Sequence, residues 1–302
     1  MPELPDVLLY IEALKSRVLG QTLEHVRLAS PFVVRSVKPP ISAIAGRKVI
    51  ALRRLGKQIV FEFEGGLFLV IHLMIAGRFQ WKPRGARVPG KLGLAAFDFP
   101  SGTLLLTEAG SKKRASLHVV QGESNLVAFD RRALEVLDST LENFRDVLTR
   151  ENHTLKRSLT DPRLFSGIGN AYSDEILHRA RMSPMKLTFK LTADEIDRLH
   201  AAVKSTLSEW IDRLQAESAT EFPSKVTAFR PQMAVHGRYG QPCPICGSPV
   251  QRIVYADNEC NYCATCQTEG RLLADRAMSR LLKEDWPRSL DEWEVHLESR
   301  RE

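Results

Sequence analysis

The chain has 302 residues, of which 43% are hydrophobic and 26% are charged, which is the composition of an ordinary globular protein with room for about two domains. Its formal net charge of +7 is a mild bias toward polyanionic partners. No apolar stretch approaches the roughly 20 residues of a membrane span, and the N-terminus has acidic residues where a signal peptide has lysines, so we expect a cytosolic protein.

The chain begins with MPELPDVLLY, and its apolar residues follow helical spacing from Leu4 to Val18. Pro2 and Glu3 suit the first turn of such a helix, because proline is pre-organised there and an acid complements the helix dipole. A second interpretation is chemical. Removal of Met1 leaves a secondary amine on Pro2, and an α-amine with a pKa of roughly 8 is partly neutral near pH 7 and can act as a nucleophile.

After Gly20 the apolar period changes to two, which is typical of strands with one face buried. A basic loop rich in proline and glycine interrupts this region at 82–91. The first third of the chain therefore predicts one helix and an antiparallel β-sandwich. The predicted strands lie near 22–28, 47–55, 58–64, 67–73, 92–99 and 103–107.

From about residue 131 the pattern becomes helical, so we expect the linker between domains near 120–138. Asp138 or Ser139 can cap a helix that runs to 149, and Thr192 with Glu195 forms a capping box for a helix that runs to about 215. At least two more helices surround the glycine turn GIGNAYSDEIL, and the stretch 217–234 is expected to be irregular.

The glycine turn places Gly167 and Gly169 ahead of a helix that starts near Asn170. Backbone amides at such a helix start, together with the asparagine side chain, can bind one phosphate, and Lys156 lies just upstream. The alternative is a helix–helix turn with no ligand.

Two cysteine pairs have the two-residue spacing of zinc knuckles, with 16 residues between the pairs. Zn²⁺ takes four thiolates tetrahedrally, and a closed site of this kind leaves no position for catalysis, so we expect one structural zinc. The segment between the pairs predicts a β-hairpin with its turn near Asp257. Cys260 has the same spacing to Cys263, but the CxxCQ ending favours the outer pair and leaves Cys260 as a spare thiol. The predicted ligands are Cys243, Cys246, Cys263 and Cys266.

Beyond the cysteines, LADRAMSRLLKEDW at 273–286 predicts a helix in a C-terminal tail. This tail can be an interaction helix or a clasp on the core, and we favour the clasp.

Four motifs occur here in one order: the N-terminal PELPD, Lys57 in the strand turn RRLGKQIV, GIGNAYSDE, and the two cysteine pairs ending in CxxCQ. This combination resembles the formamidopyrimidine-DNA glycosylase / endonuclease VIII family over roughly residues 2–267. The resemblance implies an α+β protein in which a β-sandwich with a leading helix is joined to a helical domain with a helix–two-turn–helix motif and a zinc-finger β-hairpin.

On this basis we expect four segments: a catalytic domain at 1–130, a helix–two-turn–helix domain at 131–234, a zinc finger at 235–268 and an extension at 269–302. The resemblance also implies that the partner is damaged double-stranded DNA, that one Zn²⁺ is bound, and that the protein is a monomer associated with a bacterial-type nucleoid.

The resemblance assigns chemistry to individual residues. A damaged nucleoside is flipped out of the stack, Pro2 attacks C1′ of its sugar, the base leaves, and a Schiff base undergoes β- and then δ-elimination. Glu3 is the general acid/base that opens the sugar ring. Lys57 holds a phosphate and assists proton transfer, while Asn170 and the amides around Gly169, with Lys156 nearby, hold the phosphate beside the lesion.

Three departures from the family pattern bear on the substrate. Where family members that remove oxidised purines insert a methionine into the duplex, this chain has Ile75, and Met74 lies one residue earlier, on the opposite face of a strand. Arg114 can stand for the arginine that faces the orphaned base, but the neighbouring aromatic is replaced by Ala115. His72 is expected to be structural.

The third departure lies in the zinc hairpin, where Asn258 replaces a phosphate-binding arginine and Arg252 can compensate. The loop 221–232 also lacks the glycines of the flap that closes over oxidised guanine. We therefore expect formamidopyrimidine and 8-oxoguanine as substrates first, oxidised pyrimidines second, and bulky or crosslinked bases third. The competing classes are a non-catalytic protein that binds damaged DNA and a zinc-ribbon interaction protein.

Overall fold

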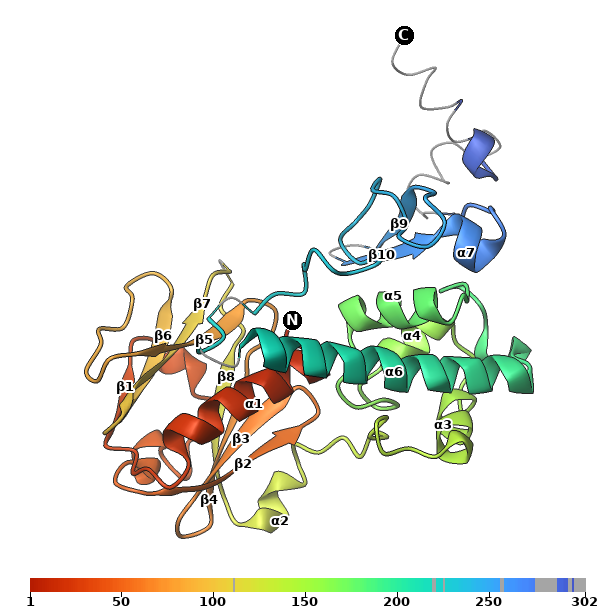
Figure 1. Cartoon of the computed structure of the whole chain (residues 1–302). Coiled ribbons are helices and arrows are strands. Elements are labelled where there is room, and N and C mark those ends of the chain that lie inside the picture. The colour runs from red at the N-terminus through yellow and green to blue at the C-terminus, as the bar shows by residue number, and fades with distance from the viewer. Residues whose placement is uncertain are drawn as a thin grey trace. The chain divides into compact units, whose positions relative to one another are not determined.

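The computed structural model describes residues 1–110, 112–218, 221–224, 226–255, 258–274, 287–292 and 295. The chain divides into two compact units (Figure 1). Unit 1 comprises Met1–Ala133 and Ser208–Ala228, and unit 2 comprises Leu134–Leu207 and Phe229–Glu302. The first boundary falls within the range expected for the linker. The finer division into four segments stays a prediction.

Unit 1 begins with helix α1 (Leu4–Val18), which follows Glu3 directly. The Asp6 carboxylate accepts a hydrogen bond from the backbone N–H of Glu3 at 3.0 Å, so a donor that the first turn leaves unpaired is satisfied. The apolar residues of α1 are buried at helical spacing, and the helix packs on strands β2 and β3. This packing fixes the position of the two residues that precede the helix.

Two antiparallel four-stranded sheets form the rest of unit 1. The first has the order β1 (His25–Leu28), β6 (Gly93–Phe99), β7 (Gly102–Glu108) and β5 (Gly77–Lys82). The second has the order β2 (Val49–Leu55), β3 (Gln58–Phe63), β4 (Leu67–His72) and β8 (Ser116–Gln121). The short helices η1 (Pro31–Val33) and η2 (Ile41–Ile44) lie between β1 and β2, and the short helix α2 (Glu123–Leu126) follows β8. All six predicted strands are present, and β5 and β8 are two that the sequence analysis missed.

The segment after helix α6 (Ala193–Glu217) belongs to unit 1 and contacts its aromatic residues through Phe222. The ring of Phe222 lies 6.1 Å from that of Tyr10 and 6.4 Å from that of Trp81, and the guanidinium of Arg17 lies 5.4 Å from its centre. This part of the predicted irregular stretch 217–234 is therefore anchored on α1 and β5.

Unit 2 contains α3 (Leu141–Leu148), α4 (Leu155–Thr160), α5 (Asn170–Arg179) and η3 (Thr188–Lys190). Helix α6 (Ala193–Glu217) begins in unit 2 and belongs to unit 1 from Ser208 onward. The capping box at the start of α6 is confirmed by hydrogen bonds of 3.0 and 3.3 Å between Thr192 and Glu195. The predicted cap of α3 is wrong. Thr140, rather than Asp138 or Ser139, accepts the hydrogen bond from Asn143 at 3.2 Å, so the helix starts one residue later.

The zinc-finger hairpin consists of β9 (Val250–Tyr255) and β10 (Asn258–Cys263), followed by the short helix α7 (Ala264–Thr268). Its predicted turn near Asp257 lies outside the described residues, as does most of the predicted helix 273–286. Within the described ranges, no helix is both long and apolar enough to cross a membrane. The predicted α+β class, with a leading helix, two sheets, a helical region and a hairpin, is confirmed.

The described part of the tail packs on this hairpin. Leu272 donates its backbone N–H to the carbonyl of Arg288 at 2.9 Å, and Arg271 forms an antiparallel bridge with Ser289. Leu290 packs against a buried cluster on the hairpin that includes Tyr262. Residues 288–290 therefore pack on the hairpin, as a clasp requires, and the choice between a clasp and an interaction helix for the whole tail stays a prediction.

Helix α5 anchors the segment that leads into the first zinc knuckle. The Glu175 carboxylate, which is buried, accepts backbone hydrogen bonds from Ala234 at 2.7 Å and from Val235 and His236 at 2.9 Å. Burial raises the pKa of Glu175, and the three N–H groups oppose that shift. The segment 234–236 is thus held by one side chain.

We expect Glu175→Gln to lower the free energy of unfolding by roughly 2–4 kcal/mol, because a carboxamide offers one acceptor oxygen to three N–H groups and turns an NH₂ toward them. Urea denaturation followed by circular dichroism measures this. The control is Glu142→Gln on the exposed face of α3, which should change stability by less than about 0.5 kcal/mol. Equal stability of Glu175→Gln and wild type contradicts the anchoring role.

Candidate functional site

The N-terminal residues that carry the predicted chemistry are buried. Pro2 and Glu3 lie at the start of α1, and Glu3 is only 2% exposed. Burial is the main cause that lowers the pKa of the Met1 α-amine; Glu3 raises it, while Arg78 and Lys57 lower it further. The environment at this end of the chain therefore favours a neutral amine, which a nucleophile requires.

Lys57 lies in the turn between β2 and β3, next to Gly56, which adopts a positive φ of 58°. His72 ends β4 opposite Gln58, the residue after Lys57. Burial, with the charge of Lys57 as the next cause, lowers the pKa of His72 to about 4. A pKa this low favours the neutral imidazole at pH 7, and the structural role of His72 stays a prediction.

The turn between β4 and β5 presents Ile75. This side chain is 58% exposed, whereas Met74 is half-buried and has a positive φ of 53°. Gly77 closes the turn, because a Cβ there would lie 2.1 Å from the carbonyl oxygen of Leu73. Arg78 donates to the carbonyls of Ile75 at 3.0 Å and Gly77 at 2.7 Å. Ile75 is therefore the exposed apolar side chain of a rigid turn.

The loop after β7 is held by a carboxylate that the sequence analysis missed. Glu108 is 2% exposed and accepts backbone hydrogen bonds from Arg114 at 2.9 Å and Ala115 at 3.1 Å. As a result Ala115 is buried while the Arg114 side chain is exposed. The only sequence signal for this anchor is an acid at the end of an apolar strand, in TLLLTE.

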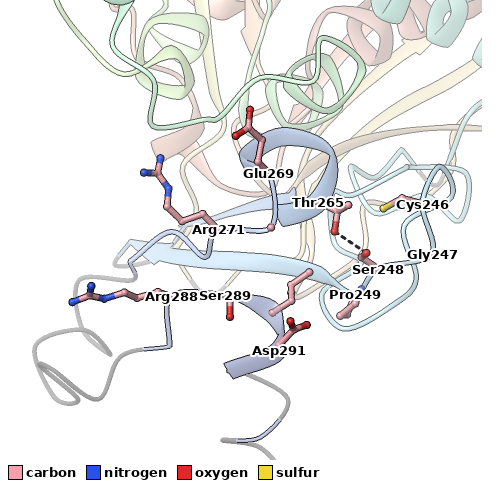
Figure 2. A pocket seen from close by; sticks show the side chains of 12 residues that line it. Cys246, Gly247, Ser248, Pro249, Thr265, Glu269, Arg271, Arg288, Ser289 and Asp291 are labelled. Atoms are coloured by element: carbon pink, nitrogen blue, oxygen red, sulfur yellow. Dashed lines mark hydrogen bonds between the residues drawn. The ribbon is translucent and has the colours of Figure 1, made fainter.

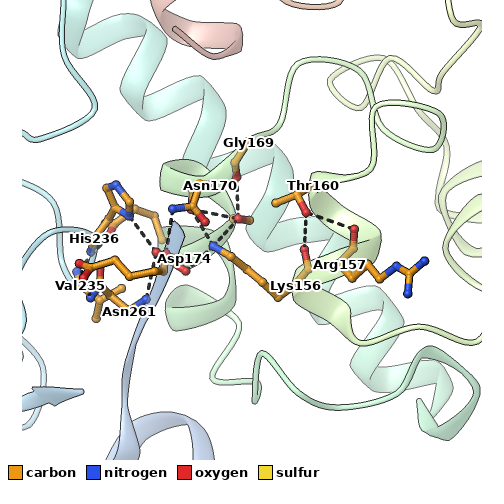
Figure 3. A network of polar contacts seen from close by, with 12 residues as sticks. Lys156, Arg157, Thr160, Gly169, Asn170, Asp174, Val235, His236 and Asn261 are labelled. Atoms are coloured by element: carbon orange, nitrogen blue, oxygen red, sulfur yellow. Dashed lines mark hydrogen bonds and ion pairs between the residues drawn. The ribbon is translucent and has the colours of Figure 1, made fainter. Parts of the chain in front are cut away.

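In unit 2 the predicted phosphate-binding residues meet in one polar network (Figure 3). Asn170 donates from Nδ2 to the carbonyl of Glu259 in β10 at 2.8 Å. Lys156 donates to the Asn170 carbonyl at 2.7 Å, to Ser173 Oγ at 2.8 Å and to the Asp174 carboxylate. The Lys156 side chain is 12% exposed, so its ammonium fixes the first turn of α5 from inside the unit.

Asp174 is the centre of this network. Its carboxylate is fully buried, and it also accepts from His236 Nδ1 at 2.8 Å and from the backbone N–H of Asn261 at 3.1 Å. These donors come from α4, the segment before the knuckle, and the hairpin. One aspartate therefore ties three parts of unit 2 together.

Gly169 caps α5, directly before Asn170.

On the hairpin, the guanidinium of Arg252 lies 4.2 Å from the ring centre of Tyr239 and 3.6 Å from the Glu259 carboxylate, and the Arg252 side chain is 46% exposed. The backbone of Asn258 pairs with Tyr255, but its side chain lies outside the described residues. Pro2, Glu3, Lys57, Ile75 and Arg114 belong to unit 1, and Lys156, Asn170 and Arg252 belong to unit 2.

The four predicted zinc ligands come together. All four Sγ atoms lie within 4.8 Å of one another, with 3.9 Å between Cys243 and Cys266 and 3.4 Å between Cys246 and Cys263. A tetrahedral site with Zn–S bonds of about 2.3 Å has sulfur atoms about 3.8 Å apart, so the cluster fits Zn²⁺. Cys260 lies outside the cluster, and burial raises the pKa of its thiol well above the ordinary value.

The zinc knuckle and the clasp enclose a shallow groove (Figure 2). Ser248 and Thr265 share a hydrogen bond of 2.8 Å across it. Its rim carries both charges, from Arg271 and Arg288 and from the carboxylates of Glu269 and Asp291, and we assign it no ligand.

Two family models match the chain. The model of the formamidopyrimidine-DNA glycosylase N-terminal domain matches residues 1–134, and that of the formamidopyrimidine-DNA glycosylase H2TH domain matches residues 134–221. A formamidopyrimidine-DNA glycosylase of Thermus thermophilus is 35% identical over 281 residues, which cover 89% of this chain and 100% of that protein. A formamidopyrimidine-DNA glycosylase-like protein of Mycobacterium tuberculosis is 41% identical over 149 residues, which cover 49% of this chain and 92% of that protein.

Solved structures give the same result. The MutM (Fpg) protein of Thermus thermophilus superposes with a TM-score of 0.75 at 32% identity, and the match covers 88% of this chain and 98% of that one. A mutant Fpg of Lactococcus lactis, in complex with DNA that contains Fapy-dG, superposes with a TM-score of 0.79 at 25% identity over 88% of this chain and 100% of that one.

We expect one zinc per chain, and we expect Cys246→Ser to lose most of it, because three thiolates cannot close a tetrahedral structural site. Metal analysis of the purified protein measures both. Cys260→Ser is the matched control and should keep one zinc, since Cys260 is outside the cluster. A fully folded wild-type protein without metal contradicts the assignment.

Proposed function

Because the chain belongs to the formamidopyrimidine-DNA glycosylase family, we propose that it excises damaged bases with Pro2, freed by removal of Met1, as its nucleophile. Family membership confirms the predicted glycosylase with AP lyase activity. The environment at the start of the chain supports the residue assignment: burial is the main cause that lowers the pKa of the Met1 α-amine, Arg78 and Lys57 lower it further, Glu3 and Asp6 oppose the shift, and Pro2, which follows directly, is itself buried.

The proposed reaction uses the nitrogen of Pro2 as electron-pair donor to C1′. The glycosidic bond breaks, the base leaves with the bonding electrons and takes up a proton, and the Pro2 nitrogen, now bonded to C1′, loses its own proton. Glu3 protonates the ring oxygen as the C1′–O4′ bond breaks, and the lone pair of the Pro2 nitrogen forms the iminium with C1′. Loss of the C2′ proton then expels the 3′ phosphate, and a second elimination expels the 5′ phosphate. The burial of Glu3, which follows Pro2 in the chain, supports this proposed role.

DNA is the proposed partner, bound as a duplex by a monomer in the cytoplasm. Lys57 and the α5 start at Gly169 and Asn170 are proposed to hold phosphates beside the lesion, and Lys156 supports that start through its hydrogen bonds. Arg252 and Asn258 are proposed to extend the contact along the hairpin. Solved Lactococcus lactis relatives contain DNA with Fapy-dG or an abasic site, which supports this partner.

Formamidopyrimidine is the proposed first substrate, with 8-oxoguanine beside it. A second candidate is activity on oxidised pyrimidines or bulkier bases. It is favoured by the alanine at position 115, which has no ring to stack beside the orphaned base. Ala115 is buried, and Arg114 is the exposed side chain of the pair. Ile75 is proposed to fill the space left by the flipped nucleoside, with Met74 packed behind it.

Sodium borohydride trapping tests the mechanism. We expect wild type to form a covalent complex with duplexes that contain an abasic site, a formamidopyrimidine, 8-oxoguanine or an oxidised pyrimidine, and the pattern of bases names the substrate. Pro2→Gly should trap much less, and Glu3→Gln should lose base removal. Pro5→Ala, which keeps the terminal amine, is the control. Absence of trapping on every duplex supports a damage-binding protein instead, and normal cleavage by Glu3→Gln refutes its assigned role.

If Ile75 fills the space left by the flipped nucleoside, its substitution should affect base removal and not strand cleavage. Ile75→Ala should slow base excision roughly tenfold, because an apolar side chain that fills the stack contributes about 1.5 kcal/mol or more. Trapping on an abasic site should stay near the wild-type rate, because no base has to be held out of the stack. Val37→Ala, at an apolar residue that is 83% exposed, is the control. A larger effect of Met74→Ala transfers the role to Met74.

A further inference from the structure

One face of α5 contacts the zinc hairpin or its first knuckle at three successive turns. Asn170 donates to the Glu259 carbonyl at 2.8 Å, and Asp174 accepts from the Asn261 N–H at 3.1 Å. His178 Nε2 lies 3.2 Å from Cys243 Sγ. These helix residues are four apart, so they lie above one another on the same side of the helix. The helix therefore aligns the metal centre with the turn at its own start.

Once zinc is bound, the donor and the acceptor of the hydrogen bond between His178 and Cys243 are defined. A zinc ligand is a thiolate, which has no proton to give and accepts hydrogen bonds. His178 is 6% exposed and Cys243 is 2% exposed, so water does not compete at this contact. Nε2 must then carry the proton and donate it toward sulfur.

We propose that His178 is a positioning residue of the metal centre, whose Nε2–H orients the Cys243 thiolate and holds the zinc knuckle in register with α5. Outer groups that hydrogen-bond to ligands typically change metal affinity 10- to 100-fold. The N–H also withdraws electron density from sulfur, which alters the metal–thiolate bond itself. The role of His178 at the metal centre does not depend on the proposed function; only the statement that α5 links this centre to a phosphate-binding residue, Asn170, does.

The test uses the full chain loaded with zinc or with cobalt(II). His178→Phe removes the donor and keeps a ring of similar size, while His178→Gln keeps an N–H near the Nε2 position. The first measurement is the rate of zinc release to a chromophoric chelator. The second is the energy of the sulfur-to-cobalt charge-transfer band, which depends on the electron density at the thiolate sulfur and therefore reports the loss of the N–H donor.

We expect His178→Phe to release zinc 10 to 100 times faster and to shift the cobalt band to lower energy, and we expect His178→Gln to restore both toward wild type. His200→Phe is the matched control: His200 contacts Ser139 and Phe144 in the same unit and should change neither. Unchanged release and an unchanged band in His178→Phe overturn the proposal, as does a His178→Gln variant identical to His178→Phe.

Discussion

Unit 2 depends on the burial of two adjacent carboxylates in α5. Removing two negative charges from water is costly, and a single opposing charge rarely repays it. Asp174 and Glu175 are instead surrounded by donors: the ammonium of Lys156, the imidazole of His236, and backbone N–H groups from 234–236 and 261. Because a buried carboxylate without these partners is strongly destabilising, the helix, the segment before the knuckle and the hairpin are fixed in one arrangement.

This arrangement indicates that the zinc site has a structural role in unit 2. Four thiolates close the coordination shell, so the metal cannot activate a substrate. It holds the base of the hairpin, and the hairpin offers the Glu259 carbonyl that orients the amide of Asn170. Unit 1 follows the same principle in its own loop, where the buried carboxylate of Glu108 accepts the amides of Arg114 and Ala115. In both units, buried carboxylates position the groups proposed to meet DNA.

Local sequence patterns were sufficient to predict much of the fold and the metal cluster. Helical spacing predicted α1, alternation predicted six strands, and cysteine spacing predicted the metal cluster. Strand β5 was missed because GRFQWK is short, polar and adjacent to a glycine turn, and β8 because it follows a run of basic residues. The anchors were missed for another reason: Asp174 is 87 residues from its partner Asn261, and no periodicity reports a contact at that distance. The spacing of the cysteine pairs likewise does not predict the contact of Cys243 with His178, because His178 lies in α5, 65 residues earlier in the chain.

Two positions that bear on the substrate, Ile75 and Arg114, are exposed side chains on held turns, whereas Ala115 is buried. The proposed chemistry needs a neutral amine beside Glu3. At this end of the chain burial is the main cause that lowers the pKa of the Met1 α-amine, and Arg78 and Lys57 lower it further. Ile75 and Arg114 lie on turns held by backbone hydrogen bonds, to Arg78 in one case and to Glu108 in the other. Because those anchors do not involve the exposed side chains, these side chains can change without altering the turns. In the proposed function, base preference and strand cleavage therefore depend on different residues: the exposed side chains of these turns for the first, and the start of α1 for the second.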